Sequence, residues 1–248
     1  MVLRIIVKNI ALILSLMLIF PVFSFALQET EHAPDVTALI SKIIEAYGGK
    51  DTIESMKTVY AKGKIKALMR QDKGEYVIYF KRDRKLRSEL LYSRSSEIRI
   101  LNGSRGWRGT GKGPLPEVSN NRYLAMVFQY KRLDLPYGLL TNSYKIKKAG
   151  SDVINGKNVR VLELTDSEGP QMKIYIDPEN FHIVKISGYF RMKTVTTELS
   201  AEYSDFRVID GTPFPYKIIN YASGHKVGET IIEKYTVNSG VAVSLFEP

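Results

Sequence analysis

Residues 59–70 read Val-Tyr-Ala-Lys-Gly-Lys-Ile-Lys-Ala-Leu-Met-Arg, and this stretch decides the fold class. Its odd-numbered positions, from Val59 to Met69, carry small or apolar residues, whereas lysines dominate the even-numbered positions. A period of two places alternate side chains on opposite faces of a β-strand. We therefore predict a strand with one apolar face and one face in water.

Comparable stretches recur along the chain, and turn sequences such as Gln71-Asp72-Lys73-Gly74 and Asn102-Gly103 separate them. The expected strands cover residues 58–70, 75–82, 85–92, 96–101, 105–109, 143–149, 158–165, 171–177, 181–188, 194–206, 215–221 and 227–237. An antiparallel sheet of about 11–12 strands curls into a barrel or half barrel rather than staying flat.

Two stretches follow a helical pattern instead. Apolar residues recur at helical spacing over residues 36–47, and Gly48-Gly49 ends that helix. A second helix is expected over about 119–133, followed by an irregular segment over 134–142, with no helix beyond it. The predicted fold is mainly β, of the α+β class: a curved antiparallel sheet whose concave face is capped by amphipathic helices.

The N-terminal residues 1–26 have the layout of a secretory signal peptide. Arg4 and Lys8 precede an apolar stretch, and Ser24-Phe25-Ala26 supplies small residues for a cut after Ala26. The alternative is an uncleaved membrane anchor, for which the apolar stretch is short. We expect an exported protein in which residues 27–248 form a single domain.

The amino-acid composition excludes several kinds of site and partner. The absence of cysteine removes disulfides, thiolate catalysis and cysteine metal sites. The formal net charge of +10 is compatible with nucleic acid or an anionic surface, but export argues against nucleic acid. The lysines on outward strand faces then serve solubility, or they give a weak, transient attraction to an anionic membrane or an acidic partner.

No motif for catalysis, a metal or a cofactor is present in the sequence. The three histidines, His32, His182 and His225, lack a neighbouring nucleophile or a second ligand at metal-binding spacing. The sequence contains no phosphate-binding loop, nucleophile elbow or zinc-protease motif. We therefore predict no enzymatic activity, although carboxylates converging in a cleft, or a histidine beside a serine, would revive that reading.

Aromatic and aliphatic residues suggest where a ligand would bind. Tyr76, Ile78 and Phe80 share one strand face that ends at Arg82, and Ile98, Ile100 and Trp107 are placed on the same side of the sheet. These side chains either fill an ordinary core or line a cavity for acyl chains. The cavity-lining candidates are Ala61, Ile65, Tyr76, Ile78, Phe80, Ile98, Ile100 and Trp107.

Arg82 is the one charged residue singled out in this region. A guanidinium at the end of an apolar face needs acceptors, such as the carbonyls at a helix C-terminus. In a lidded barrel that bond would latch the lid, whereas the simpler reading is a strand-end arginine in water.

Several segments, taken in order, resemble the periplasmic outer-membrane lipoprotein-sorting proteins of the LolA-like superfamily. They are Tyr47-Gly48-Gly49, residues 74–82, Asn102-Gly103-Ser104-Arg105-Gly106-Trp107, residues 203–211, 214–218 and 229–234, and Ser244-Leu245-Phe246. The chain is longer than the best-known carrier, and its C-terminal strands are more similar to a broad, uncharacterised branch of the superfamily.

The resemblance implies an open half barrel plugged by helices and a periplasmic location. It implies lipid or lipoprotein acyl chains as ligand, and the lipoprotein machinery of the inner and outer membranes as partners. Lys81-Arg82-Asp83 matches the strand end whose arginine holds the lid in the family, with Asp83 in place of the family's proline. The expected function is a non-enzymatic carrier, and the alternative is an envelope sensor or scaffold with the same fold and a filled core.

Overall fold

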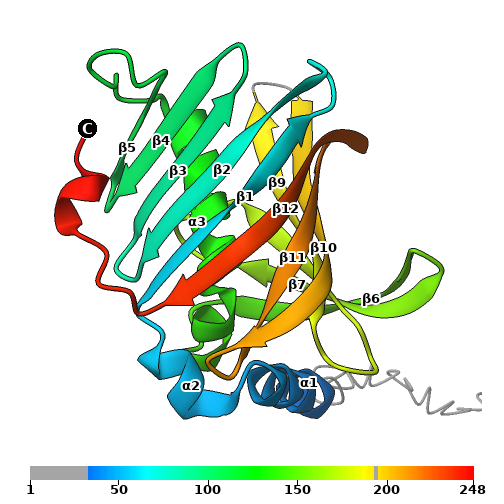
Figure 1. Cartoon of the computed structure of the whole chain (residues 1–248). Coiled ribbons are helices and arrows are strands. Elements are labelled where there is room, and N and C mark those ends of the chain that lie inside the picture. The colour runs from blue at the N-terminus through cyan, green and yellow to red at the C-terminus, as the bar shows by residue number, and fades with distance from the viewer. Residues whose placement is uncertain (1–32, 193–194) are drawn as a thin grey trace, which may run out of the picture. The chain divides into compact units, whose positions relative to one another are not determined.

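Twelve strands form one antiparallel sheet in the computed structural model, which describes residues 33–192 and 195–248. The expected signal peptide at residues 1–26 lies outside this range. The strand order is β5-β4-β3-β2-β1-β12-β11-β10-β9-β8-β7-β6, so that the sheet consists of two meanders joined where β1 pairs with β12. The sheet is open, with β5 and β6 at its edges, and it curves into a half barrel (Figure 1). The predicted fold class is confirmed.

The elements fall at the following positions. The helices are α1 (Ala33–Ala46), α2 (Gly49–Ser55), α3 (Asn120–Leu140) and the 3-10 helix η1 (Val243–Phe246). The strands are β1 (Thr58–Ala67), β2 (Asp72–Lys81), β3 (Lys85–Tyr92), β4 (Ser96–Asn102), β5 (Arg105–Gly109), β6 (Lys145–Ile154), β7 (Lys157–Thr165), β8 (Gln171–Ile176), β9 (Ile183–Met192), β10 (Val195–Ile209), β11 (Thr212–Ala222) and β12 (His225–Val237).

The first strand has the two faces that its alternation predicts. Val59, Ala61 and Ile65 are buried, whereas Lys62 and Lys64 are exposed. The strand ends earlier than expected, at Ala67, and the turn occupies residues 68–71 rather than 71–74. The reason is that Asp72 pairs with Ala67 in the ladder and accepts hydrogen bonds from the backbone N–H of Lys73 and the hydroxyl of Ser93. Met69 therefore lies in the turn and is 80% exposed.

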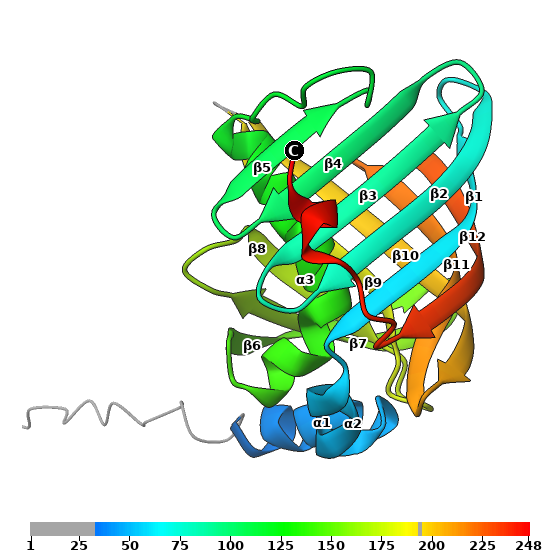
Figure 2. The same ribbon diagram turned by 60° about the vertical axis from the view of Figure 1, so that its left-hand side comes forward.

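Helix α3 lies against the concave inner face of the sheet (Figures 1 and 2). It contacts β3, β4 and β5 on one side and β9 on the other, so buried residues occur around most of its circumference. Gly188 of β9 makes this approach possible, because a Cβ atom there would lie 2.8 Å from the ring of Phe128. The helix is thus held between the two meanders.

The expectation of an irregular segment over 134–142 was wrong, because α3 continues to Leu140 with Pro136 inside it. Proline lacks the N–H that would bond four residues back, which normally interrupts a helix. Here Leu135 and Leu139 are almost fully buried, and their packing favours continuation. The 3-10 helix η1 was also unexpected, and it buries Phe246 completely.

Helices α1 and α2 close one end of the half barrel, and we call the segment that holds them, residues 33–56, the cap (Figure 1). Gly48, between them, has φ 96° and approaches the β10–β11 turn closely: a Cβ atom would lie 2.5 Å from the carbonyl oxygen of Gly211. The hydroxyl of Tyr47 accepts a hydrogen bond from the backbone N–H of Ile183 at 3.3 Å. The cap is therefore fixed to β9 and to the β10–β11 turn.

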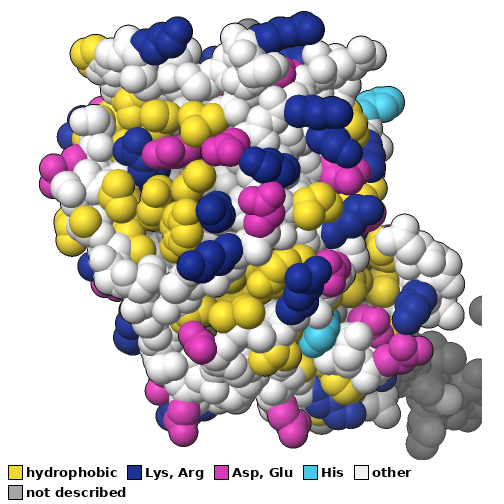
Figure 3. All heavy atoms as spheres, viewed as in Figure 1, with side chains coloured by type: hydrophobic (Ala, Val, Ile, Leu, Met, Phe, Trp, Pro, Cys, Tyr) yellow, Lys and Arg dark blue, Asp and Glu magenta, His cyan; other side chains and the backbone are white. Residues whose placement is uncertain are grey.

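The outer face of the sheet carries the charge. In the face shown in Figure 3, lysines and arginines lie interspersed with Asp and Glu rather than gathered in one patch. Pairs such as Lys64 with Glu75, at 2.9 Å, contribute to this mixture. In the part of the chain that the structure describes, no helix combines the length and the apolar character required to traverse a bilayer.

Candidate ligand-binding site

An apolar cavity lies between α3, the cap and the inner face of the sheet. Its volume is about 90 Å³, and it is lined mainly by aliphatic and aromatic side chains. Helix α3 contributes Leu133, Leu135 and Pro136, and the cap contributes Tyr47. The sheet contributes Ile78, Ile183, Ile186, Tyr203, Phe206, Phe214, Ile218, Ile232 and Tyr235. The inner face therefore keeps an apolar space that its own residues do not fill completely.

A second hollow, which we call the polar recess, lies farther from the cap. Its volume is about 300 Å³, and its lining combines polar residues, among them Arg99, Arg132 and Asn220, with apolar ones such as Leu90 and Phe128. Four residues, Tyr76, Gln129, Arg132 and Ile218, line both hollows, so the cavity and the recess are neighbours along α3.

The inner face is not uniformly apolar. On β4 and β5, Glu97 is hydrogen-bonded to both Arg99 and Arg108, the latter at 2.6 Å. Burial alone would raise the pKa of Glu97, but the two guanidiniums hold it below its ordinary value. This ionised group lies at the β4–β5 edge and does not reach the apolar cavity.

The predicted cavity-lining residues separate into four groups. Tyr76 and Ile78 line the apolar cavity, and Ile65 lines the polar recess. Ala61 and Phe80 are fully buried in the main core, where the Phe80 ring stacks on that of Tyr130 at 5.0 Å. These two residues support the wall of the cavity.

Contrary to the prediction, Ile98, Ile100 and Trp107 do not line the cavity. They form a separate cluster with Tyr79 and with the C-terminal Phe246. The register explains this difference: Ile100 lies opposite Arg87, which lies opposite Tyr79, whereas Phe80 pairs with Leu86 and Leu86 with Leu101. Leu101, not Ile100, therefore shares the inner face with Phe80. Helix η1 covers the outer cluster (Figure 2).

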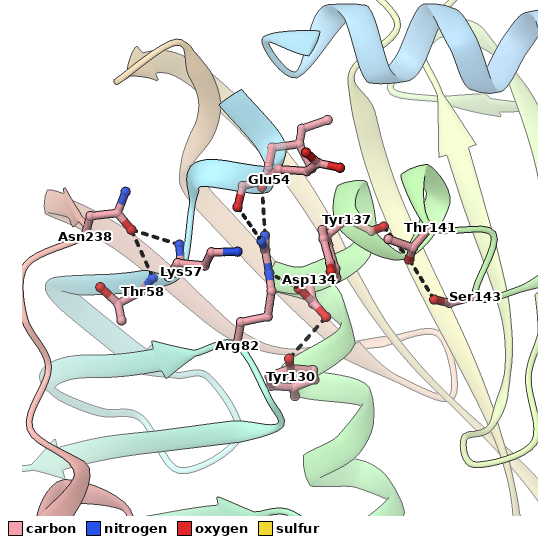
Figure 4. A network of polar contacts seen from close by, with 11 residues as sticks. Glu54, Lys57, Thr58, Arg82, Tyr130, Asp134, Tyr137, Thr141, Ser143 and Asn238 are labelled. Carbon is pink, nitrogen blue, oxygen red and sulfur yellow. Dashed lines mark hydrogen bonds and ion pairs between the residues drawn. The ribbon is translucent and has the colours of Figure 1, made fainter. Parts of the chain in front are cut away.

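Arg82 joins the sheet to the cap and to α3 (Figure 4). Its guanidinium donates to the carbonyl oxygens of Ile53 at 2.9 Å and Glu54 at 3.2 Å, at the C-terminal end of α2. It also donates to Asp134 of α3 at 3.2 Å and lies 3.8 Å from the centre of the Tyr137 ring. These contacts satisfy helix carbonyls that have no partner within the helix. Whether the contact acts as a latch remains a prediction.

Asp134 is the buried counter-charge of Arg82. Its other carboxylate oxygen accepts from the Tyr130 hydroxyl at 3.1 Å, and its side chain is 16% exposed. Burial raises the pKa of Asp134 above its ordinary value, although the charge of Arg82 acts against this shift. Arg82 and Asp134 therefore depend on each other, because either charge alone would be buried without compensation.

Most of the cavity-lining residues were not predicted from the sequence. The lining residues on β9 to β12 were not identified, although Phe214, Tyr216 and Ile218 alternate as an inner face requires. Arg132 and Gln129 carried no such signal, since only the position of α3 against the sheet brings them to the boundary of the two hollows. In the described ranges 33–192 and 195–248, no group of three or more His, Cys, Asp or Glu could hold a metal ion.

An open antiparallel half barrel with helices over an apolar inner cavity defines a LolA-like fold, and solved structures bear this out. A LolA superfamily protein from Nitrosomonas europaea aligns with a TM-score of 0.56 at 16% identity, covering 86% of this chain and 97% of that chain. A DUF1329 family protein from Desulfovibrio piger also aligns with a TM-score of 0.56, at 13% identity, with the same two coverages.

A third structure is a domain from Vibrio parahaemolyticus assigned to outer membrane lipoprotein sorting. It aligns with a TM-score of 0.53 at 12% identity and covers 85% of this chain and 95% of that chain. No protein-family model matches the sequence, and a search of curated proteins finds no match either. The likeness is thus one of fold, and at that level the resemblance to the LolA-like superfamily is confirmed.

Proposed function

We propose that the protein is a non-enzymatic carrier that binds lipid or lipoprotein acyl chains in the apolar cavity. The observation that carries this proposal is the cavity itself, which lies between the sheet and three helices and is lined by aliphatic and aromatic side chains. Burying a chain of about 12 methylenes contributes roughly 10 kcal/mol before ordering costs. The apolar lining therefore suits this class of ligand.

The proposed setting is the periplasm, with a role in the sorting of outer-membrane lipoproteins. The domain from Vibrio parahaemolyticus named for that process shares the fold, which supports this setting. The basic, signal-like start of the sequence at Arg4 and Lys8 supports export. The partners on this proposal are the lipoprotein machinery of the two membranes, with transient contact at a membrane surface.

The cavity must enlarge before it can hold a long chain. Its volume of about 90 Å³ falls below the roughly 300 Å³ at which small-molecule sites begin. The small volume also favours a second candidate function, an envelope sensor or scaffold that keeps a filled interior. The two functions differ in one property, namely whether the interior takes up a chain.

A fluorescent fatty acid distinguishes the two functions. Ile186 lines the cavity and is almost fully buried, so Ile186→Trp should fill the space and weaken binding about tenfold or more. Val208→Trp is the matched control, because Val208 is 69% exposed. Saturable binding by the wild type and the control, together with lipid retained in native mass spectrometry, supports the carrier. If the wild type neither binds the fatty acid saturably nor retains lipid, the carrier function fails and the sensor or scaffold function is favoured.

A further inference from the structure

Arg132 occupies an unusual position between the apolar cavity and the polar recess. It lies on α3 and is half-buried, and its side chain crosses the hollow towards β10 and β11. Its Nε donates to the hydroxyl of Tyr203 at 2.8 Å, and one terminal nitrogen donates to the Oδ1 of Asn220 at 3.2 Å. Both acceptors are uncharged groups.

The charge of Arg132 is therefore not balanced by its neighbours. Within the described residues, no carboxylate forms a salt bridge with it. Burial raises the pKa of Tyr203 even beside this guanidinium, so the phenol stays neutral. Burial likewise raises the pKa of Tyr76, the other phenol at the boundary. A partly buried cation among neutral oxygens favours an incoming anion.

The lining of the polar recess, like the surroundings of Arg132, carries an excess of positive charge. It contains two arginines, Arg99 and Arg132, and no acidic residue. Arg99 shares its carboxylate partner, Glu97, with Arg108, so this group on the inner face of β4 and β5 is itself net positive. The neutral lining residues Asn220 and Thr230 add hydrogen-bonding groups.

We propose that the polar recess binds the anionic head group of a single-chain amphiphile, with Arg132 as the anchor and the acyl chain in the apolar cavity. This inference rests on the proposed function and specifies its ligand. The continuity of the site supports it, because Tyr76, Gln129, Arg132 and Ile218 line both hollows. The recess volume of about 300 Å³ reaches the lower range of small-molecule sites. A carboxylate and a phosphate both match the fork of a guanidinium.

Calorimetric titration with four dodecyl compounds, below their micelle-forming concentrations, tests this assignment. The probes are dodecanoate, dodecyl phosphate, dodecanol and dodecylammonium, and inorganic phosphate is titrated alone. At least one of the two anions should bind the wild type about tenfold to a hundredfold more tightly than dodecanol does, as expected for a hydrogen bond to a charged group. The two anionic arms identify the head group as a carboxylate or a phosphate.

Variants of Arg132 test whether this residue causes the preference for an anionic head group. In Arg132→Gln the ratio of anion affinity to dodecanol affinity should fall to about one, whereas Lys62→Gln, the same charge change on the exposed outer face, should keep the wild-type ratio. Arg132→Lys retains the charge and should keep part of the preference for an anion. This variant also tests the role of Arg132 if Arg132→Gln does not fold.

Three outcomes overturn the assignment. The first is equal affinity of the wild type for dodecanol and both anions, and the second is an anion preference that survives in Arg132→Gln. The third is inorganic phosphate binding as tightly as dodecyl phosphate, which would indicate a free-anion site. In these cases dodecanol binding leaves the proposed carrier function intact. If no dodecyl compound binds, the carrier function fails, and the head-group assignment fails with it.

Discussion

Two arginines on the inner side of the half barrel differ in the partners that the fold provides. Arg82 meets a buried carboxylate, Asp134, and two carbonyls of α2. Among the described residues, Arg132 donates hydrogen bonds to a phenol and an amide oxygen and pairs with no carboxylate. The strand-end position of Arg82 made it identifiable from the sequence, since it ends an apolar face. The partners of both arginines are set by tertiary packing, so the sequence alone did not reveal Arg132.

At the residue scale, Arg82→Leu should destabilise the protein by about 3 kcal/mol. The substitution removes the charge that compensates Asp134, whose side chain is 16% exposed, and it leaves the α2 carbonyls without a donor. Denaturant unfolding measures the loss. Amide hydrogen exchange over residues 53–55 should accelerate more than exchange in β1, because α2 loses its tie to the sheet.

Arg87→Leu is the matched control for this experiment. Arg87 pairs with Glu89 at 2.6 Å on the outer face and donates to the carbonyl oxygen of Leu245 in η1, so its partners among the described residues lie away from the cap. Its loss should leave exchange over residues 53–55 unchanged. Equal acceleration in both variants would remove Arg82 from the role of latch.

At the element scale, side-chain periodicity accounts for what the sequence predicted and for what it did not. Period-two alternation and the turn sequences between strands located all twelve strands, although β6 is exposed along almost its whole length. Periodicity does not specify which face of a neighbouring strand is inside, so Ile100 was assigned to the wrong face of β4. It also failed for the C-terminal half of α3, where Pro136 signalled an end that tertiary packing overrides.

The element-scale prediction concerns the cap. The cavity of about 90 Å³ has to enlarge, and the cap supplies Tyr47 and Met56 to its wall. The native chain has no cysteine, so Thr52→Cys and Asp210→Cys introduce only the thiols wanted for a short bis-maleimide cross-link between the cap and the β10–β11 turn. Cross-linking should weaken dodecanol binding at least tenfold.

The same double variant, capped with a monofunctional maleimide, is the control for the cross-link. It carries both modifications but leaves the cap free, and should bind dodecanol as the wild type does. Unchanged binding by the cross-linked protein would mean that the cavity enlarges elsewhere, for example by a shift of α3.

At the scale of the whole molecule, the two meanders and α3 divide the inside of the half barrel into two compartments. The apolar cavity lies next to the cap, and the polar recess lies beyond Arg132. The outer face carries its own small core, in which Trp107 packs against Ile100 and Phe246. The inner and outer faces of the sheet therefore have separate apolar clusters. A tryptophan placed in either cluster can report whether a bound acyl chain lies near it.

The position of a bound chain tests the central claim most directly. Trp107 is the single tryptophan and reports on the outer face, whereas Trp107→Phe/Phe206→Trp moves the reporter to the cavity wall. Titration with dodecanoate brominated along its chain should quench the tryptophan at position 206 saturably and leave Trp107 in the wild type unquenched. Equal quenching at both positions, or none at position 206, would contradict binding of an acyl chain inside the half barrel.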